Sequence, residues 1–294
     1  MTVINTNTAA TLTANALTKN ERAMSQAMER LSTGQRINSA SDDAAGLAIS
    51  SRMTSQINGL NMAVRNANDA ISMVQTADGA LVEVSNMLQR MRELGVQAMT
   101  GTNSATDNDA LNTELTALIG GIEDIAADTQ WNGTNLLDGT PGATAFQVGA
   151  NATQTVSVTF ADLNTANGSA SSGLFENLDS STLGDDTEAT HSIAGLDFDD
   201  ATKAADAMTM IDQAITRVND HRATLGATIN RLEYAADNLA NVSQNTSASR
   251  SRVLDADYAS ETTELARTQI IQQAATAMLS QANQQAQSVL ALLK

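Results

Sequence analysis

The sequence predicts a mainly α protein: a long antiparallel helical bundle or coiled coil formed by the N- and C-terminal halves, with a small β-hairpin insert. The first observation is composition, since Pro141 is the one proline and aromatic residues make up 2% of the chain. Proline costs ~3 kcal/mol in a helix interior, whereas the abundant alanine favours helix. The second observation is a helical repeat of apolar residues in both halves. The third is that strand-like alternation occurs between those halves.

The N-terminal half carries an apolar seam with alternating spacings of 3 and 4, as at the a and d positions of a heptad repeat. Asp78 and Ser85 interrupt this seam. A helix from about 57 to 98 would be ~60 Å long at the usual rise per residue. A shorter helix is expected to follow the Thr100–Ser104 stretch. The seam residues are Ile57, Leu60, Val64, Ala67, Ile71, Val74, Leu81 and Leu88, and the shorter helix carries Leu111, Leu115, Leu118, Ile122 and Ile125.

The C-terminal half repeats this spacing twice. The first seam is interrupted by Arg222, and the second has apolar residues around much of the helix. We expect the seam residues of both halves to pack within the chain or between subunits. The residues assigned to subunit packing are Ile57, Leu60, Val64, Ile71, Ile211, Ile215, Leu225, Ile229, Ile271, Met278, Val289, Leu290 and Leu293.

Turn and strand signals divide the chain further. Gly34 and Asn38 suit a bend, and Ser41 is expected to be the N-cap of the long helix, so 32–40 is predicted to be a connector. Period-2 alternation around Phe146 and over 155–160 predicts the hairpin.

The charge distribution limits the classes of partner. Residues 93–202 contain 17 Asp and Glu and no Lys or Arg, whereas the rest of the chain carries 16 acidic and 16 basic residues. A nucleic-acid partner is not expected, because such proteins carry a basic surface. Cysteine is absent, which excludes disulfides and thiolate sites. The first residues lack the basic and apolar regions of a secretory signal, and no apolar run has the ~18 residues of a membrane span.

The outermost segments have broad apolar faces but few bulky side chains. The inner helices at 57–98, 104–128 and 203–245 can bury their seams within one molecule. The two terminal segments have too few bulky apolar residues to form a core alone. We therefore expect them to be poorly ordered in a monomer and to fold when other copies cover them. This pattern favours a polymer.

Several runs resemble bacterial flagellins over about 1–137 and 203–294. The run LSTGQRINSASDDAAGLAI at 31–49 is similar to the N-terminal signature of that family, and WNGTNLL at 131–137 resembles the end of its first conserved half. SRVLDADYASE at 251–261 and the tail from Gln269 to Leu293 resemble its C-terminal signature.

The resemblance implies a structural subunit of the flagellar filament, secreted without a cleaved signal peptide and serving swimming motility. Residues 1–40 plus 255–294 would form the inner tube, and 41–254 a helical domain with its insert at 138–202 and no large outer variable domain. The implied partners are further copies of the chain, an export chaperone at the C-terminal helix, and the filament cap and hook-junction proteins.

The stretch QRMRELGVQ at 89–97 is similar to the segment that Toll-like receptor 5 recognises in many flagellins. The resemblance implies receptor contacts at Gln89, Arg90, Leu94 and Gln97, with Glu114 on the following helix. The primary role of these residues is expected to be structural: the arginines are solvated charges, and Leu94 belongs to the core of a subunit contact. Gly95 departs from the more usual alanine-like residue and costs about 0.5–1 kcal/mol in a helix.

No catalytic, metal or cofactor site is expected. His191 and His221 lack neighbouring acid or nucleophile patterns, and Asp197–Asp200 lacks most of a calcium loop. Three alternatives stay open: a hook–filament junction protein, a soluble coiled-coil scaffold, and an enzyme or carbohydrate-binding module in 138–202. Copy number per filament and proteolysis of the termini distinguish the first two from flagellin. The third lacks the chain length for a pocket.

Overall fold

The computed structural model describes residues 7–163, 173–175, 178 and 193–291, with the backbone alone over 285–291. The chain divides into two compact units, each built from both halves of the sequence. One unit comprises Met1–Asn58 with Ser243–Lys294, and the other comprises Gly59–Val242. The predicted mainly α fold with a small hairpin is confirmed.

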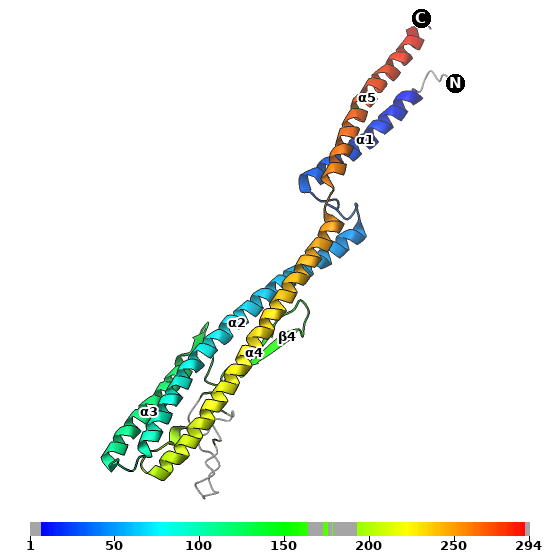
Figure 1. Ribbon diagram of the computed structural model, residues 1–294. Coiled ribbons are helices and arrows are strands. Elements are labelled where there is room, and N and C mark those ends of the chain that lie inside the picture. Colours follow the sequence, from blue (N-terminus) through cyan, green and yellow to red (C-terminus); the bar gives the residue numbers. More distant parts are fainter. Residues whose placement is uncertain (1–6, 164–172, 176–177, 179–192, 292–294) are drawn as a thin grey trace. The chain divides into compact units, whose positions relative to one another are not determined.

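The unit of residues 59–242 is a bundle of three helices that lie side by side (Figure 1): α2 (Ala44–Ala98), α3 (Ala105–Asp128) and α4 (Ala201–Leu254). The predicted seams supply its core, in which Val74, Leu81 and Leu88 of α2 and Ile211 and Val218 of α4 are fully buried. Burial of these side chains drives the pairing of the two halves, because each contributes about 1.5–3 kcal/mol when removed from water.

The two charged interruptions of the seams, Asp78 and Arg222, form one ion pair. Arg222 Nε donates to Asp78 Oδ1 at 2.9 Å, although the residues are 144 positions apart. Both side chains are about one-third exposed. The breaks in the two heptad patterns therefore lie opposite each other, and each compensates the charge of its partner.

The start of α2 corrects one sequence prediction. The helix begins at Ala44, and Asp43 caps it by accepting a hydrogen bond from the Gly46 amide at 2.8 Å, so Ser41 is not the N-cap. The Asp42 carboxylate instead closes the preceding turn by accepting from the amides of Asn38 and Ser39. Hydrogen bonds from Ser39 lower the pKa of Asp42. Of these two adjacent aspartates, Asp42 stabilises the turn and Asp43 caps the helix.

Two short antiparallel ribbons follow α3. The predicted hairpin consists of β3 (Ala143–Gln147) and β4 (Thr155–Thr159), with Phe146 opposite Val156. Val156 packs with Ala70 of α2 and Leu232 of α4. The second ribbon, β1 (Gln130–Trp131) and β2 (Thr134–Asn135), was not predicted. Its Asn132-Gly133 turn has positive φ at both residues (49° and 80°), the conformation that Asn-Gly favours in a two-residue hairpin loop.

The insert ends in the short helix η1 (Ile193–Gly195) before α4 begins. Phe160, Phe175 and Phe198 of this region are buried in the bundle core. His191 and most of residues 164–192 of the predicted insert lie outside the described residues.

The unit formed by the chain ends contains the antiparallel helices α1 (Thr8–Thr33) and α5 (Tyr258–Ala291). Gly34 ends α1 in a left-handed conformation (φ 70°) and donates to the Arg30 carbonyl at 2.9 Å. The predicted connector then pairs with the end of α4 and the residues after it: Arg36 N–H donates to the Leu254 carbonyl, and Ala256 N–H donates to the Gly34 carbonyl. This bridge ties the two connectors of the unit together.

Candidate assembly surface

The interface between α1 and α5 is unusual because its most buried side chains are polar or small. Over the described side chains of the two helices, 7–33 and 258–284, the buried residues are Asn20, Ala27 and Thr268. A self-sufficient helix pair places bulky apolar residues at these positions. Leu17, Met24 and Leu265 are half-buried, so the pair buries none of its bulky apolar side chains completely within the described residues.

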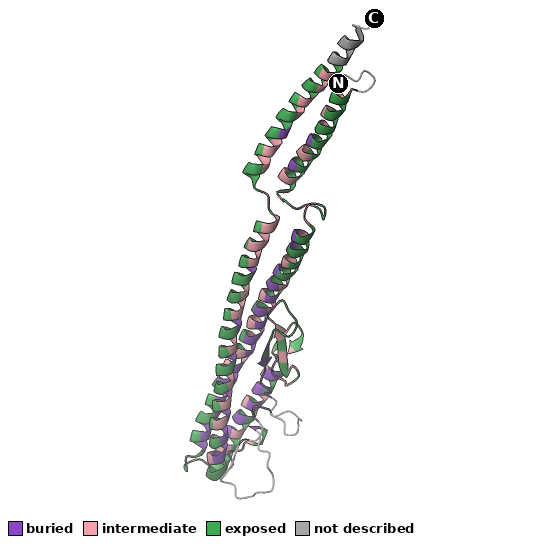
Figure 2. Cartoon of the chain, turned by 90° about the vertical axis from the view of Figure 1, so that its right-hand side faces the viewer, coloured by how far each residue is buried: buried purple, intermediate pink, exposed green. Residues whose placement is uncertain are grey.

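Bulky apolar side chains instead lie on the outside of the same helices. Figure 2 shows that α1 and α5 are largely exposed. Exposed bulky apolar side chains are candidates for contact with another copy of the chain. The exposed fractions range from 39% to 73% over Leu12, Met28, Ile270, Ile271 and Met278.

Polar contacts connect the two helices at three levels. Arg30 Nη1 contacts Glu261 Oε1 at 3.1 Å. The Asn20 side-chain amide donates to the Thr268 carbonyl at 2.7 Å, and that of Asn7 donates to the Ala282 carbonyl at 3.1 Å. Asn7 also caps α1 by accepting from the Ala10 amide. The order of the partners along α5 is consistent with one antiparallel register.

The residues predicted to pack between subunits fall into three groups. Ile57, Leu60, Ile211 and Leu225 are buried within the chain, and Val64, Ile71, Ile215 and Ile229 are half-buried. Ile271 and Met278 are exposed. The side chains of Val289, Leu290 and Leu293 lie outside the described residues. The first set holds the single molecule together, whereas the exposed residues are available to another copy.

The receptor-contact candidates occupy neighbouring faces of α2 and α3. Gln89, Arg90 and Gln97 are exposed, and Arg90 bridges to the exposed Glu114 at 2.9 Å. Leu94 is 2% exposed and lies in the core beneath this surface. The structure thus brings four of the candidates to the surface and places Leu94 inside.

Gly95 has a structural role that its sequence position did not reveal. A Cβ at this residue would lie 2.9 Å from Met208 Cγ and 3.6 Å from the ring of Phe198. The glycine therefore allows the start of α4 and the Phe198 side chain to approach α2 closely.

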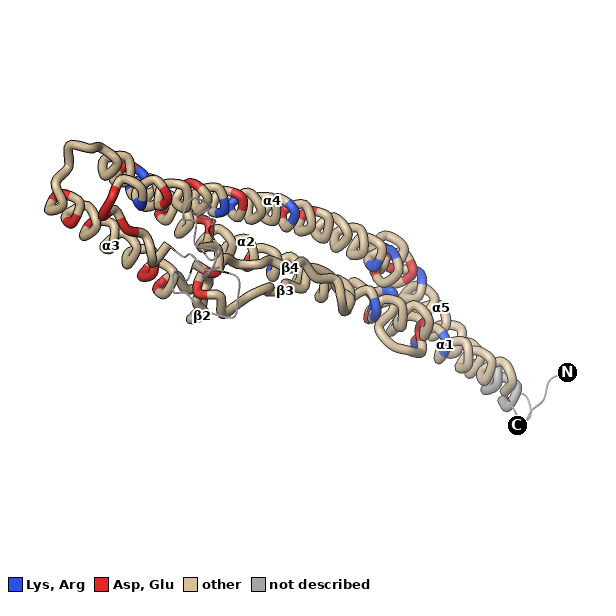
Figure 3. Tube along the Cα trace, turned by 90° about the horizontal axis from the view of Figure 1, so that it is seen from below, with Lys and Arg blue, Asp and Glu red and all other residues tan. Residues whose placement is uncertain are grey.

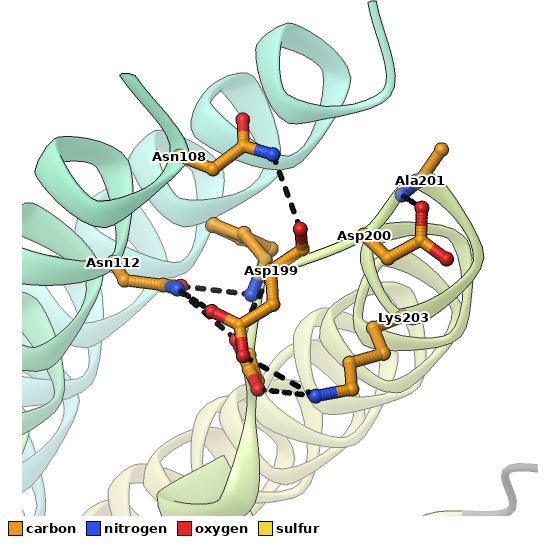
Figure 4. A network of polar contacts seen from close by, with 8 residues as sticks. Asn108, Asn112, Asp199, Asp200, Ala201 and Lys203 are labelled. Carbon is orange, nitrogen blue, oxygen red and sulfur yellow. Dashed lines mark hydrogen bonds and ion pairs between the residues drawn. The ribbon is translucent and has the colours of Figure 1, made fainter. Parts of the chain in front are cut away.

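A polar network at the end of the bundle joins the 197–200 loop to α3 (Figure 4). The Asn112 side-chain amide donates to Asp197 Oδ1 at 3.0 Å and to Asp199 Oδ1 at 2.9 Å, while its oxygen accepts from the Phe198 amide at 2.8 Å. Lys203 Nζ contacts Asp197 at 2.8 Å and Asp199 at 3.3 Å. The sequence did not predict this anchor, since about 85 residues separate its two sides.

The network also explains the acidic run that resembles part of a calcium loop. Burial acts to raise the pKa of Asp197, but hydrogen bonds from Lys203, Asp199 and Asn112 together lower it below its ordinary value. The lysine charge and the amide donors already compensate these carboxylates. Among the described residues, no group of three or more His, Cys, Asp or Glu side chains is placed to hold a metal ion.

Figure 3 shows Asp and Glu positions along α3 without Lys or Arg, whereas Lys and Arg positions lie on helices from the two ends of the sequence. None of the helices, over their described residues, has a stretch that is long and apolar enough to cross a membrane.

These features define a mainly α protein whose two chain ends pair into a helical unit that exposes several bulky apolar side chains. The model of the bacterial flagellin N-terminal helical region matches residues 4–141, and that of the flagellin C-terminal helical region matches 208–293. A flagellin of Bacillus subtilis (strain 168) is 45% identical over 312 residues, which cover 99% of each chain. A flagellin of Halalkalibacterium halodurans is 46% identical over 270 residues, covering 92% of this chain and 91% of the relative.

A crystal structure of Bacillus cereus flagellin has 34% sequence identity to this chain. It covers 60% of this chain and 88% of its own, with a TM-score of 0.46. The chain belongs to the bacterial flagellin family. The family is one of structural proteins, and membership implies a subunit of the extracellular flagellar filament.

Proposed function

We propose that this chain builds the flagellar filament by burying the outer faces of α1 and α5 against further copies of the same helices. The observation that carries the proposal is the set of exposed bulky apolar side chains on a helix pair whose buried residues, among the described side chains, are Asn20, Ala27 and Thr268. Covering an exposed Leu, Ile or Met side chain stabilises an assembly by about 1.5–3 kcal/mol. Repeated along a filament, this contribution favours polymer over monomer.

The test replaces one exposed side chain on α5. Met278→Asp places a charge on the surface, so we expect seeded filament growth to be lost. Met278→Leu retains an apolar side chain of similar size and should assemble like the unmodified chain. Growth is followed by negative-stain electron microscopy, and circular dichroism checks that both variants keep the helical bundle. Filaments of normal length from Met278→Asp would refute the proposal.

We further propose that residues 1–40 with 255–294 act as the inner tube and 41–254 as the surrounding helical domain. With few buried apolar residues, the terminal pair should open far more readily than the bundle. Hydrogen exchange on the soluble chain should therefore reveal slow exchange in the core of α2 and α4 and fast exchange in α1 and α5. Strong protection of both terminal helices in a lone molecule would contradict this division and favour a soluble scaffold.

The exposed apolar residues of α5 also support the proposal that an export chaperone binds this helix before secretion. Ile270, Ile271 and Met278 would be covered in transit and released for assembly. The filament cap and hook-junction proteins are proposed to contact the same terminal unit. Copurification of a partner with the full chain, lost in Ile270→Asp and kept in Ile270→Leu, tests the chaperone contact.

Recognition by Toll-like receptor 5 is proposed to use the exposed surface of Gln89, Arg90, Gln97 and Glu114, with Leu94 supporting it from below. Arginine at the centre of an interface commonly contributes strongly to binding. Arg90→Ala should weaken binding to the receptor ectodomain at least about tenfold, equivalent to about 1.4 kcal/mol. Arg92→Ala, a nearby exposed arginine paired with Asp212 at 2.6 Å, is the matched control. Equal effects of the two changes would contradict this assignment.

A further inference from the structure

The hydrogen bond from Asn20 of α1 to the Thr268 carbonyl of α5 is the most buried polar contact between the two terminal helices. Asn20 is 8% exposed and Thr268 is 1% exposed. The Thr268 hydroxyl donates within its own helix to the carbonyls of Glu264 and Leu265, so the contact between the helices is made by the asparagine amide. Its donor–acceptor distance of 2.7 Å lies at the short end of the normal range.

The remainder of the interface is poorly suited to determine how the helices align. Ala27 is the buried apolar residue of α1, and its small side chain fits against many neighbours. A slip of one helical turn, about 5.4 Å, would exchange small and apolar residues for similar ones. A buried amide is different, because it needs an acceptor at a defined distance and angle and loses solvation without one.

The two other polar contacts impose weaker constraints. Arg30 has a long flexible side chain that can follow Glu261 through a small displacement. Asn7 lies at the end of α1 and is half-buried. Both contacts agree with the register that Asn20 sets. Residues 30, 20 and 7 of α1 contact residues 261, 268 and 282 of α5 respectively, so the partners run in opposite directions along the two helices.

We propose that Asn20 is a positioning residue that selects the register of α1 against α5, and thereby the pattern that the pair presents to a second copy. This inference rests on the proposed assembly function. In the selected register, the exposed Leu12 and Met28 of α1 and Ile270, Ile271 and Met278 of α5 take fixed heights relative to one another. A shifted register changes their relative heights, so that identical copies no longer cover one another. A buried polar residue in a coiled coil specifies register in the same way, at a cost in stability.

The experiment uses cysteine cross-links, which report register cleanly because the chain has no native cysteine. One cysteine replaces Met24, and a second replaces Glu261, Leu265 or Gln269 in turn, positions about one helical turn apart. In the otherwise unchanged chain, one of the three pairs should dominate in filaments. Each pair is then combined with Asn20→Leu, which has similar volume without the donor, or Asn20→Gln, which keeps the carboxamide. Asn15→Leu makes the same change at an exposed position of α1.

Variants are co-assembled with a ninefold excess of unmodified chain, so that a variant unable to polymerise alone still enters filaments. We expect Asn20→Leu to lower the ratio of dominant to shifted cross-links about tenfold and to slow seeded growth of the pure variant. Asn15→Leu should change neither measurement, and Asn20→Gln should recover most of the dominant cross-link. An unchanged cross-link ratio in Asn20→Leu would overturn the inference while leaving assembly intact. Failure of the unmodified chain to polymerise would instead overturn the proposed function.

Discussion

The ion pair between Asp78 and Arg222 should be more strongly coupled than other charge pairs between α2 and α4. Both side chains are about one-third exposed and occupy positions where the heptad seams are interrupted. Exposed pairs contribute 0.2–1 kcal/mol, whereas removing one partner of a buried pair costs about 3–5 kcal/mol. This half-buried pair lies between those limits, so we expect Arg222→Leu or Asp78→Leu alone to lower the free energy of unfolding by about 1–2 kcal/mol.

The double variant Asp78→Leu/Arg222→Leu removes both charges and completes the apolar seam. We expect its stability to equal or exceed that of the unmodified chain, giving a coupling energy of at least about 2–4 kcal/mol between the two sites, the sum of the two single losses. Urea unfolding of the soluble chain, followed by helical circular dichroism at constant m-value, measures each corner of the cycle.

A second pair between the same helices provides the matched control. Arg92 and Asp212 are 2.6 Å apart, but their side chains are 47% and 50% exposed. The corresponding cycle should give a coupling below about 0.5 kcal/mol that declines further with salt. Equal coupling energies in the two cycles would refute the argument that the coupling of Asp78 and Arg222 arises from their position in the seam rather than from ion pairing itself.

Four further predictions concern single positions in the chain. Gly79→Ala should raise the free energy of unfolding by about 0.5–1 kcal/mol, because the new Cβ meets nothing within 4 Å. Gly95→Ala should give no such increase, because its Cβ would clash with Met208. Urea midpoints of the two variants measure the difference. Burial lowers the pKa of His221, so the unfolded chain binds its proton more tightly and stability should fall as pH drops through about 6.5. His221→Phe should flatten the urea midpoint between pH 7.5 and 5.5, and an unchanged slope would contradict this. The carboxylate of Asp107, whose pKa is lowered by hydrogen bonds from Ser104, should lose its contribution only below about pH 4. Leu290→Asp should block filament growth while urea unfolding of the α2–α4 bundle stays unchanged, and normal filaments would argue against a packing role for the tail.

The sequence by itself determined the helices, the seams and the hairpin. Each is a local pattern: a 3,4 repeat from Ile57 to Leu88, the same repeat around Ile211, and a period of 2 at 155–160. Local patterns predict local structure because backbone geometry decides which residues share a face. The long helix begins at Ala44, three residues after the predicted Ser41 cap, because nothing in residues 44–56 breaks a helix although the apolar repeat has not yet begun.

The tertiary structure decided which polar residues meet. In the sequence, Asp78 and Arg222 are two unrelated interruptions of apolar seams, but in the structure they form an ion pair. Asn112 is an ordinary helix residue in the sequence, 85 positions from Asp197, to which it donates in the structure. The tertiary structure also placed Asn20 and Thr268 inside the terminal pair and Ile270 and Met278 outside, which amphipathic spacing does not reveal on a helix that is apolar around much of its circumference. Such pairings depend on chain segments that are far apart in sequence, and these segments become neighbours only when the two halves pack against each other.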